Sequence, residues 1–271
     1  MMEIKINNFT VGKNHQLFFI LGPCVIESEK HTLFMAEEIT RIAIDLQIPF
    51  IFKASFDKAN RSSIHSFRGV EIKKGMKILQ KVREKFKVPI LTDIHEPDQA
   101  KVVAEVVDVI QIPAFLSRQT NLIKAASETG KIINVKKGQF LAPWDMKNVV
   151  EKCRESGAEN IMLTERGATF GYNNLVSDMR SIPIMQKFNV PVIFDATHSL
   201  QLPAGNGKET GGMREYVPHL AKAAIAAGAD GIFMEVHHDP NNALSDSATQ
   251  WPLDKLYDLL SELKLIASVV R

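Results

Sequence analysis

Short apolar segments and amphipathic segments alternate along the whole chain without a break. The apolar segments, which are rich in β-branched and aromatic residues, cover residues 17–21, 49–54, 88–93, 108–113, 131–137, 160–165, 190–196 and 230–236. In the stretches between them, apolar residues recur at three- and four-residue spacing, as in helices that pack on a sheet. Strands that are apolar on both faces favour parallel pairing under a layer of helices. Eight such units predict one α/β domain over residues 1–271, a closed (β/α)₈ TIM barrel rather than an open sheet.

The N-terminal segment has a different pattern. EIKINNFTVGKNHQLFF, at about residues 3–19, alternates apolar and polar residues around a polar GKNH centre. This pattern predicts a β-hairpin before the first barrel strand. We expect the hairpin to plug the N-terminal end of the barrel.

Composition excludes several classes of function. The net charge of +2 gives no broad basic surface for nucleic acid. No segment reaches the roughly 18 apolar residues of a membrane span, and the N-terminus has no apolar signal core. The two cysteines are far apart and form no disulfide framework. Neither GxxxxGK[ST] nor GxGxxG follows a strand, so no nucleotide cofactor is expected. We therefore expect a cytoplasmic protein without a membrane or nucleic-acid partner.

All eight predicted strands end in polar or ionisable residues. These are Cys24, Lys53, Asp93, Gln111, Lys136 with Lys137, Arg166, Asp195 with His198, and Glu235. In barrels of this kind, the active site lies at the C-terminal ends of the strands. Loops begin there, so some polar residues occur at these positions in any barrel. Polar or ionisable residues at all eight strand ends predict an active site.

Three of these residues, with Asp246, predict a metal site. Closing the barrel brings Cys24, His198 and Glu235 together from neighbouring strands, with Asp246 in the loop after the last strand. A thiolate, an imidazole and two carboxylates suit one divalent ion such as Zn²⁺, Fe²⁺, Co²⁺ or Mn²⁺. Alternatively, Cys24 is a small buried residue, or a nucleophile with His198 as its base, which leaves Glu235 without a role. The second cysteine, Cys153, lies in the helical stretch VVEKCRES and has no predicted role.

Cationic side chains form two further groups. The loop KASFDKANRSS, residues 53–63, contains Lys53, Lys58, Asn60, Arg61, Ser62 and Ser63. Such groups bind phosphate through charge and forked donors. A charge run is more often a solvated helix face, but this loop lacks helical periodicity. Lys136 and Arg166 are placed to hold a second anion across the barrel mouth. Two cationic groups beside a metal indicate two phosphorylated or carboxylated substrates.

The strand-end motifs together resemble the 3-deoxy-D-manno-octulosonate 8-phosphate synthase family. They are GPCVIES, FKASFDKANRSSIHSFRG, TDIHE, QIPAFLSRQT, NVKKGQF, ERGATFGYNNLVSDMR, FDATHSLQLP, GGMREY and LSDSATQWPL, and they span nearly the whole chain. The resemblance implies a transferase that condenses phosphoenolpyruvate with D-arabinose 5-phosphate and water. Its product feeds lipopolysaccharide assembly. The run ANRSS favours this family over the related heptulosonate phosphate synthases, which use erythrose 4-phosphate.

The resemblance also assigns roles to residues. Phosphoenolpyruvate is expected to bind Lys53, Lys58, Lys136 and Arg166, and arabinose 5-phosphate to bind Asn60, Arg61 and Ser62, with Arg118 from a neighbouring subunit of a homotetramer. Asp93 and Gln111 are expected between the substrates, and Gln201 near His198. The residues expected to take part in catalysis are Cys24, His198, Asp246, Lys136 and Asp93. The segment PAGNGKETGG, residues 203–212, is a candidate lid.

Cys24 places the chain in one branch of this family. Members that work without metal carry Asn at the matching position, and members with Cys depend on a metal ion. The resemblance therefore implies that Cys24, His198, Glu235 and Asp246 are metal ligands. Two rival interpretations remain, a Schiff-base aldolase that uses Lys136 or Lys53 and a sugar-phosphate sensor without turnover.

Overall fold

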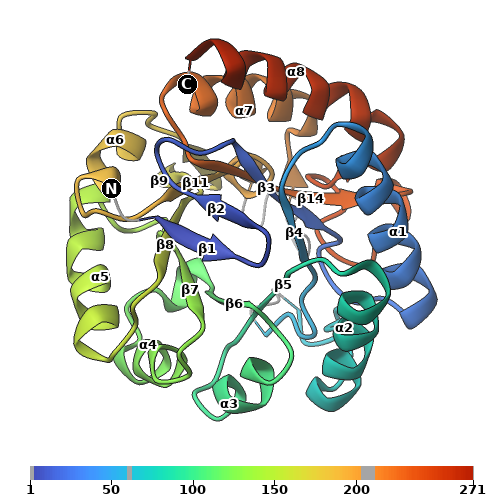
Figure 1. Ribbon diagram of the computed structural model, residues 1–271, viewed down its shortest axis with the longest axis horizontal. Helices are drawn as coiled ribbons and strands as arrows, with labels where there is room; N and C mark the ends of the chain where they lie inside the picture. The colour runs from blue at the N-terminus through green and yellow to red at the C-terminus, as the bar shows by residue number, and fades with distance from the viewer. Residues whose placement is uncertain (1–2, 60–62, 203–210, 271) are drawn as a thin grey trace.

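The computed structural model describes residues 3–59, 63–202 and 211–270 and shows a closed barrel (Figure 1). Its parallel strands are β3 (Phe18–Gly22), β4 (Phe50–Lys53), β5 (Ile90–Asp93), β6 (Val109–Ile112), β7 (Ile132–Lys136), β8 (Ile161–Glu165), β11 (Val192–Asp195) and β14 (Gly231–His237). The ring closes because β14 pairs with both β11 and β3. The predicted (β/α)₈ fold is confirmed, with each strand within two residues of its predicted bounds.

Helices surround the barrel on its outer side (Figure 1). They are α1 (Glu29–Asp45), α2 (Ile72–Phe86), α3 (Gln99–Ala104), α4 (Thr120–Ser127), α5 (Met146–Glu155), α6 (Ser181–Gln186), α7 (Val217–Ala226) and α8 (Leu256–Val270). The first helix begins at Ser28, whose side chain accepts the backbone N–H of His31 at 3.1 Å. This cap satisfies a donor that the helix itself leaves unpaired.

Each barrel strand packs on both faces, as β3 shows. Phe19 and Leu21 belong to the core between the sheet and the helices, whereas Phe18 and Ile20 belong to a second core inside the barrel. Side chains alternate between the two faces of a strand, so an unbroken apolar run fills both cores. Burying one such side chain contributes about 1.5–3 kcal/mol.

The N-terminal hairpin closes one end of the barrel. Strands β1 (Ile4–Ile6) and β2 (Phe9–Val11) pair antiparallel, and their apolar side chains join the inner core. Figure 1 shows the hairpin across the barrel axis. The predicted hairpin and plug are confirmed, but the predicted extent to residue 19 is wrong. The chain turns at Gly12, where the N–H of His15 bonds its carbonyl, and residues 18–19 belong to β3.

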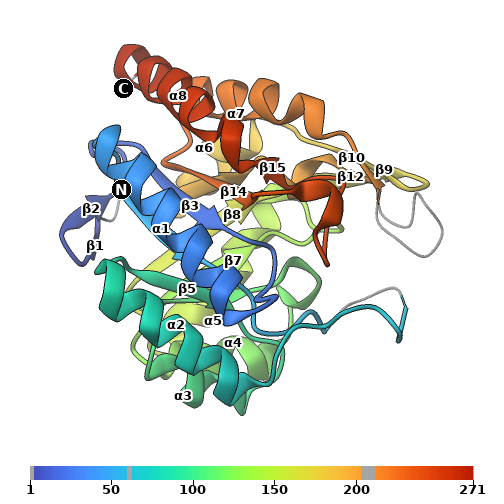
Figure 2. The same cartoon turned by 90° about the vertical axis from the view of Figure 1, so that its right-hand side faces the viewer.

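Several short elements extend the opposite end (Figure 2). They are the hairpin of β9 (Ala168–Gly171) and β10 (Asn174–Val176), the pair β12 (Gln201–Leu202) and β13 (Gly211–Gly212), and β15 (Trp251–Pro252), which pairs with β14. Single-turn helices are η1 (Ala114–Leu116), η2 (Pro143–Asp145), η3 (His198–Leu200), η4 (Arg214–Tyr216), η5 (Pro240–Asn242) and η6 (Leu253–Lys255).

Two expectations concern segments beyond these elements. Residues 203–210 of the candidate lid lie outside the described residues, and its last two residues form β13. Among the described helices, none has the length and apolar character needed to cross a membrane.

Candidate active site

Cys24 is buried just beyond the end of β3. Gly22, two residues earlier, passes so close to β4 that a Cβ at this position would clash with the carbonyl oxygen of Lys53, so only glycine fits there. The backbone N–H of Cys24 donates to Gln250 Oε1 at 3.1 Å, and its Sγ lies 2.9 Å from Ser245 Oγ. The glycine corner and these two partners place the thiol beside the loop that follows β14.

The other three predicted metal ligands lie close to this thiol or to one another. Donor atoms of Cys24, Glu235 and Asp246 all lie within 4.8 Å of one another. His198 Nε2 lies 3.4 Å from Glu235 Oε1 and 3.6 Å from Asp246 Oδ2. Within the described chain, Glu235 Oε2 is buried and has no hydrogen-bond partner. This oxygen keeps its capacity to bind a cation.

The electrostatics of this group favour a bound cation. Burial, followed by the charges of Asp246 and Glu235, raises the pKa of the Cys24 thiol well above its usual value. Negative groups this close repel one another unless positive charge lies between them. A divalent ion supplies that charge and stabilises the thiolate. The residues therefore fit an ion of the Zn²⁺ type by position, by donor chemistry and by charge.

Asp195 orients the imidazole of His198. Its Oδ2 lies 2.7 Å from His198 Nδ1, and its Oδ1 accepts the backbone N–H of His198 at 2.9 Å. Burial alone would lower the pKa of His198, but Asp195 and Glu235 outweigh it and raise this pKa to about 9. A carboxylate on one ring nitrogen is the usual support of a metal-binding histidine, because it directs the other nitrogen to the ion.

Two buried lysines are held by carboxylates at the same end of the barrel. Lys53 Nζ donates to Glu235 Oε1 at 2.6 Å and to the carbonyl of Cys24 at 2.8 Å. Lys136 Nζ donates to Asp195 Oδ2 at 2.5 Å and lies 3.8 Å from the centre of the Phe233 ring. Charge pairs of this kind fix both ammonium groups at the centre of the mouth.

Further predicted anion-binding residues lie around these lysines. Lys58 Nζ is 3.7 Å from Glu235 Oε1. Arg166 follows β8 and donates from Nη2 to Gln201 Oε1 at 2.6 Å. Its buried Nη1 has no partner among residues 3–59, 63–202 and 211–270. The adjacent Lys137 turns away from this group and donates to the carbonyls of Gly138, Leu141 and Gly167.

Asp93 and Gln111 end β5 and β6 as predicted, and both are buried. Burial alone would raise the pKa of Asp93, but His95 and Lys58 hold it well below its usual value. Gln111 Oε1 accepts Nδ2 of Asn134 at 3.1 Å. Asn134 Oδ1 in turn accepts a hydrogen bond from Thr164 at 2.8 Å. This chain of bonds fixes the Gln111 amide and leaves its NH₂ group available to a ligand.

Among the described residues, Arg118 is a predicted site residue that does not join this cluster. Asn60, Arg61 and Ser62 lie outside the described residues. Arg118 is exposed between η1 and α4, where its carbonyl accepts a hydrogen bond from Lys152 at 3.0 Å. A single described chain does not bring Arg118 to the mouth.

Sequence reasoning missed the residues that hold the predicted ones. Ser245 and Gln250 contact Cys24, His95 contacts Asp93, and Asn134 contacts Gln111. The sequence signals that could have identified these supporting residues are weak. His95, Gln250 and Asn134 lie inside the motifs TDIHE, LSDSATQWPL and NVKKGQF, and Asn134 also lies in an apolar strand, where a buried amide requires partners.

The fold and the mouth define an enzyme of the (β/α)₈-barrel class, with donors for one metal ion beside a cationic site for anionic substrates. The sequence matches the profile of the DAHP synthetase I family over residues 1–270. The chain belongs to this family. It is 58% identical over 261 residues to the "2-dehydro-3-deoxyphosphooctonate aldolase" of Rickettsia typhi, covering 96% of this chain and 95% of that protein. It is 56% identical over 269 residues to the protein of the same name from Geobacter metallireducens, with 99% of both chains covered.

Proposed function

We propose that this chain condenses phosphoenolpyruvate with D-arabinose 5-phosphate and water. The products are 3-deoxy-D-manno-octulosonate 8-phosphate and inorganic phosphate, and the octulosonate supplies lipopolysaccharide assembly. The observation that carries the proposal is identity of 56–58% over almost the full length to proteins named for 2-dehydro-3-deoxyphosphooctonate, the same eight-carbon acid phosphate. The cationic mouth supports it, because both substrates are anions.

The buried cations hold phosphoenolpyruvate. A lysine ammonium has three N–H donors. Lys53 and Lys136 each donate one short hydrogen bond to a protein carboxylate. Each ammonium has a further N–H that can donate to a carboxylate or phosphate oxygen of the substrate. Arg166 adds its buried Nη1, which has no partner among the residues that the structure describes. These groups sit on strand ends, so the anion is bound by a rigid frame.

The reaction joins C3 of phosphoenolpyruvate to the aldehyde carbon of the open-chain sugar. The aldehyde oxygen gains a proton, and water adds its hydroxyl at C2. The resulting phosphohemiketal loses phosphate by cleavage of its C–O bond. Asp93 and the amide of Gln111 are placed to position the reacting groups, because both end adjacent strands beside the anion site.

Cys24, His198, Glu235 and Asp246 would hold one divalent ion in this mechanism. When bound, such an ion stabilises negative charge on the aldehyde oxygen or activates the added water. The chain's own residues keep the site ready for it. Asp195 fixes His198, and Ser245 with Gln250 fixes Cys24.

A Schiff-base aldolase is the main chemical rival. Burial lowers the pKa of Lys136, as that mechanism needs. However, the carboxylate of Asp195 at 2.5 Å favours the ammonium form, which is not nucleophilic. Borohydride in the presence of substrate traps a Schiff base covalently, and we expect no such adduct here.

One assay tests the proposed function directly. Phosphate release from phosphoenolpyruvate is measured with arabinose 5-phosphate and with erythrose 4-phosphate in parallel. We expect turnover with the five-carbon sugar and little with the four-carbon sugar. A preference for erythrose 4-phosphate would assign the chain to the heptulosonate reaction, and no turnover with either sugar would indicate a sensor.

Arg61→Ala should weaken the use of the sugar phosphate selectively. The resemblance assigns Arg61 to arabinose 5-phosphate, and loss of a charged hydrogen bond costs about 2–4 kcal/mol. We expect KM for the sugar to rise roughly 30- to 1000-fold, with a small change in KM for phosphoenolpyruvate. Arg68→Ala is the matched control, since Arg68 is largely exposed and pairs with Asp57. Equal effects on both substrates would contradict the assignment.

We also propose a cytoplasmic homotetramer. Both cysteines are buried and unpaired, as suits a reducing compartment. Phe115, Phe140 and Trp144 are each more than half exposed in segments that flank Arg118 or follow β7. Exposed aromatic side chains of this kind mark a protein interface. A neighbouring subunit seated there would bring its mouth close to Arg118.

Mixing two inactive variants tests this arrangement. Arg118→Ala should be impaired because it lacks the sugar-phosphate contact, and Lys136→Met because its own mouth is defective. In mixed oligomers, a Lys136→Met subunit can supply its Arg118 to the mouth of an Arg118→Ala subunit, which is otherwise intact. We expect activity to reappear after the two proteins are mixed and allowed to exchange subunits. No recovery in demonstrably mixed oligomers would place Arg118 outside the neighbouring site.

A further inference from the structure

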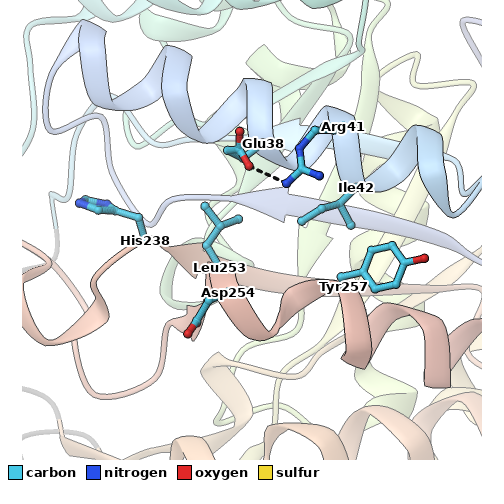
Figure 3. Close-up of a pocket in the computed structure, with 7 residues that line it drawn as sticks. All are labelled: Glu38, Arg41, Ile42, His238, Leu253, Asp254 and Tyr257. Atoms are coloured by element: carbon cyan, nitrogen blue, oxygen red, sulfur yellow. Dashed lines mark hydrogen bonds and ion pairs between the residues drawn. The ribbon is translucent and has the colours of Figure 1, made fainter.

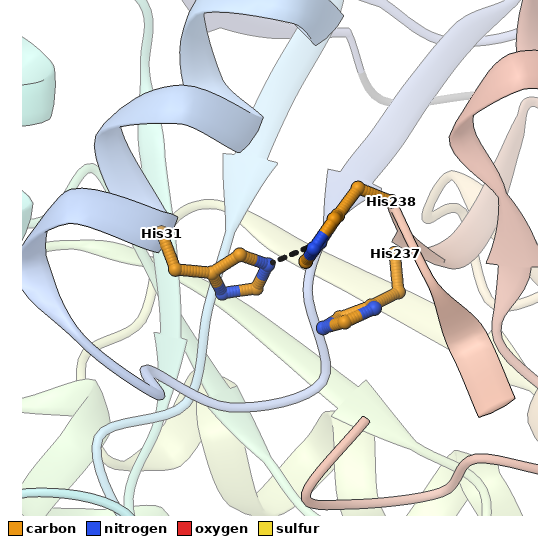
Figure 4. Close-up of side chains that lie close together, drawn as sticks. All are labelled: His31, His237 and His238. Atoms are coloured by element: carbon orange, nitrogen blue, oxygen red, sulfur yellow. Dashed lines mark hydrogen bonds between the residues drawn. The ribbon is translucent and has the colours of Figure 1, made fainter. Parts of the chain in front are cut away.

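Three histidines lie together outside the mouth (Figure 4). His31 lies in the first turn of α1, His237 ends β14, and His238 follows it. The ring centres are 4.6 Å apart for His31 and His237 and 5.0 Å apart for His31 and His238. The fold thus brings together imidazoles from segments 207 positions apart.

The nitrogen positions match those of metal ligands. His238 Nδ1 and His31 Nε2 are 3.2 Å apart. Two imidazoles bound tetrahedrally to Zn²⁺, each at about 2.0–2.1 Å, have nitrogens about 3.3 Å apart. One ring nitrogen from each of the three histidines lies within 4.8 Å of the other two.

We propose that His31, His237 and His238 form a second metal site, distinct from the group around Cys24. The site would take a divalent ion that prefers imidazole, such as Zn²⁺ or Ni²⁺. It does not depend on the function proposed for the mouth. His31 and His238 form the preset pair of ligands, and His237 is the third.

Glu27 supports the site from behind. Its Oε2 lies 3.9 Å from His31 Nδ1, and its Oε1 lies 3.2 Å from His237 Nε2. His31 Nδ1 has no hydrogen-bond partner among the described residues, but the negative charge of Glu27 on that side favours a ring hydrogen at Nδ1 and a lone pair at Nε2. Burial, followed by the nearby His237, lowers the pKa of His31 to about 4.

His237 must change one contact to bind the ion. Its Nδ1 accepts the backbone N–H of Asp239 at 3.0 Å, which places the ring hydrogen on Nε2. Coordination through Nε2 requires the hydrogen on Nδ1, so His237 gives up the bond from Asp239 when the ion arrives. In the described structure, its buried Nε2 has no hydrogen-bond partner of good geometry.

A groove gives the ion its own path to the site. It has a volume of about 370 Å³ between α1 and α8 and is lined by Glu38, Arg41, Ile42, His238, Leu253, Asp254 and Tyr257 (Figure 3). His238 lies at the end of this row of side chains in Figure 3. The carboxylates of Glu38 and Asp254 favour cations, although Glu38 also binds Arg41 at 2.8 Å. An ion therefore reaches the histidines from the outer side of the barrel.

Ion counting in a protein without the Cys24 group tests the proposal. In the background Cys24→Ala/Asp246→Ala, native mass spectrometry and calorimetry with Ni²⁺ alone should show one ion per chain. Adding His31→Gln and His238→Gln should lower the affinity by more than about 100-fold. His219→Gln is the matched control, because His219 is an exposed histidine on α7 beside Tyr216. No bound ion in the background, or an ion kept by the histidine variant, would overturn the proposal.

A second measurement covers the case in which that background does not fold. Co²⁺ added to the metal-free wild-type protein should give two ions per chain, of which one shows a thiolate-to-metal charge-transfer band. His31→Gln/His238→Gln should keep that band and lose the other ion. Equal ion counts in the two proteins would overturn the second site, whatever the outcome at Cys24.

Discussion

Dialysis against a strong chelator should abolish phosphate release, and added Zn²⁺ or Mn²⁺ should restore it. The reason is the group of Cys24, Glu235 and Asp246, whose donor atoms lie within 4.8 Å of one another and are of the types that bind a divalent ion. A catalytic metal ion supplies several kcal/mol of transition-state stabilisation, so the rate should fall by at least about 1000-fold. The measurement is turnover beside metal content at each step. Full activity in demonstrably metal-free protein would contradict it.

Variants of Cys24 separate a geometric from a chemical role of the ion. The family resemblance implies Asn at this position in members that work without metal, so Cys24→Asn should lose tight metal binding yet keep measurable activity in chelator. Cys24→Ala has neither thiolate nor amide and should lose both metal and rate. If Cys24→Asn is as inactive as Cys24→Ala, the ion has a chemical role that an amide cannot replace. If Cys24→Ala keeps its metal and its rate, Cys24 is not a ligand.

Lys136→Met should reduce kcat/KM for phosphoenolpyruvate by at least about 1000-fold. The substitution keeps a side chain of similar length but removes the ammonium, which lies 3.8 Å from the centre of the Phe233 ring and is proposed to bind the substrate anion. It also removes the partner of Asp195 at 2.5 Å. Breaking a buried pair costs about 3–5 kcal/mol of stability, so thermal unfolding must be measured beside the kinetics.

A control separates the lost charge from a general effect of the substitution. Lys147→Met changes an exposed lysine that pairs with Glu151 on α5 and should leave both the rate and the unfolding temperature nearly unchanged. If folded Lys136→Met stays within tenfold of the wild-type rate, Lys136 does not bind the reacting anion.

The barrel could be predicted from the sequence because its strands are buried on both faces. A strand that is apolar on both faces, such as Phe18–Gly22, is stable in few places other than a parallel sheet that is covered on both sides. The hairpin of β9 and β10 was missed, since most of its residues are exposed and its apolar pattern is weak. The short helices α3 and α6 span only 6 residues each, too few to show a clear helical period.

The convergence of Cys24, His198, Glu235 and Asp246 could be predicted because strand ends and the loops that follow them meet by topology alone. The supporting residues could not, because their roles depend on close contacts. Asn134 matters through a 3.1 Å bond to Gln111, and Gln250 through a 3.1 Å bond to Cys24. The histidine cluster had no local signal either, since His31 lies far from His237 in the sequence. Only packing of α1 against the end of β14 brings them together.

The hairpin closes the end of the barrel opposite the mouth, so selection for stability and selection for catalysis act on different residues. Ile4, Ile6 and Val11 complete the inner core at the end opposite the mouth, and the candidate metal and anion groups lie at the strand ends, or in the loops that follow them, on the other side. Substitutions in the hairpin therefore change the stability of the fold without changing the reaction at the mouth. Descendants of this chain can adapt to a new growth temperature through the hairpin while the mouth stays the same.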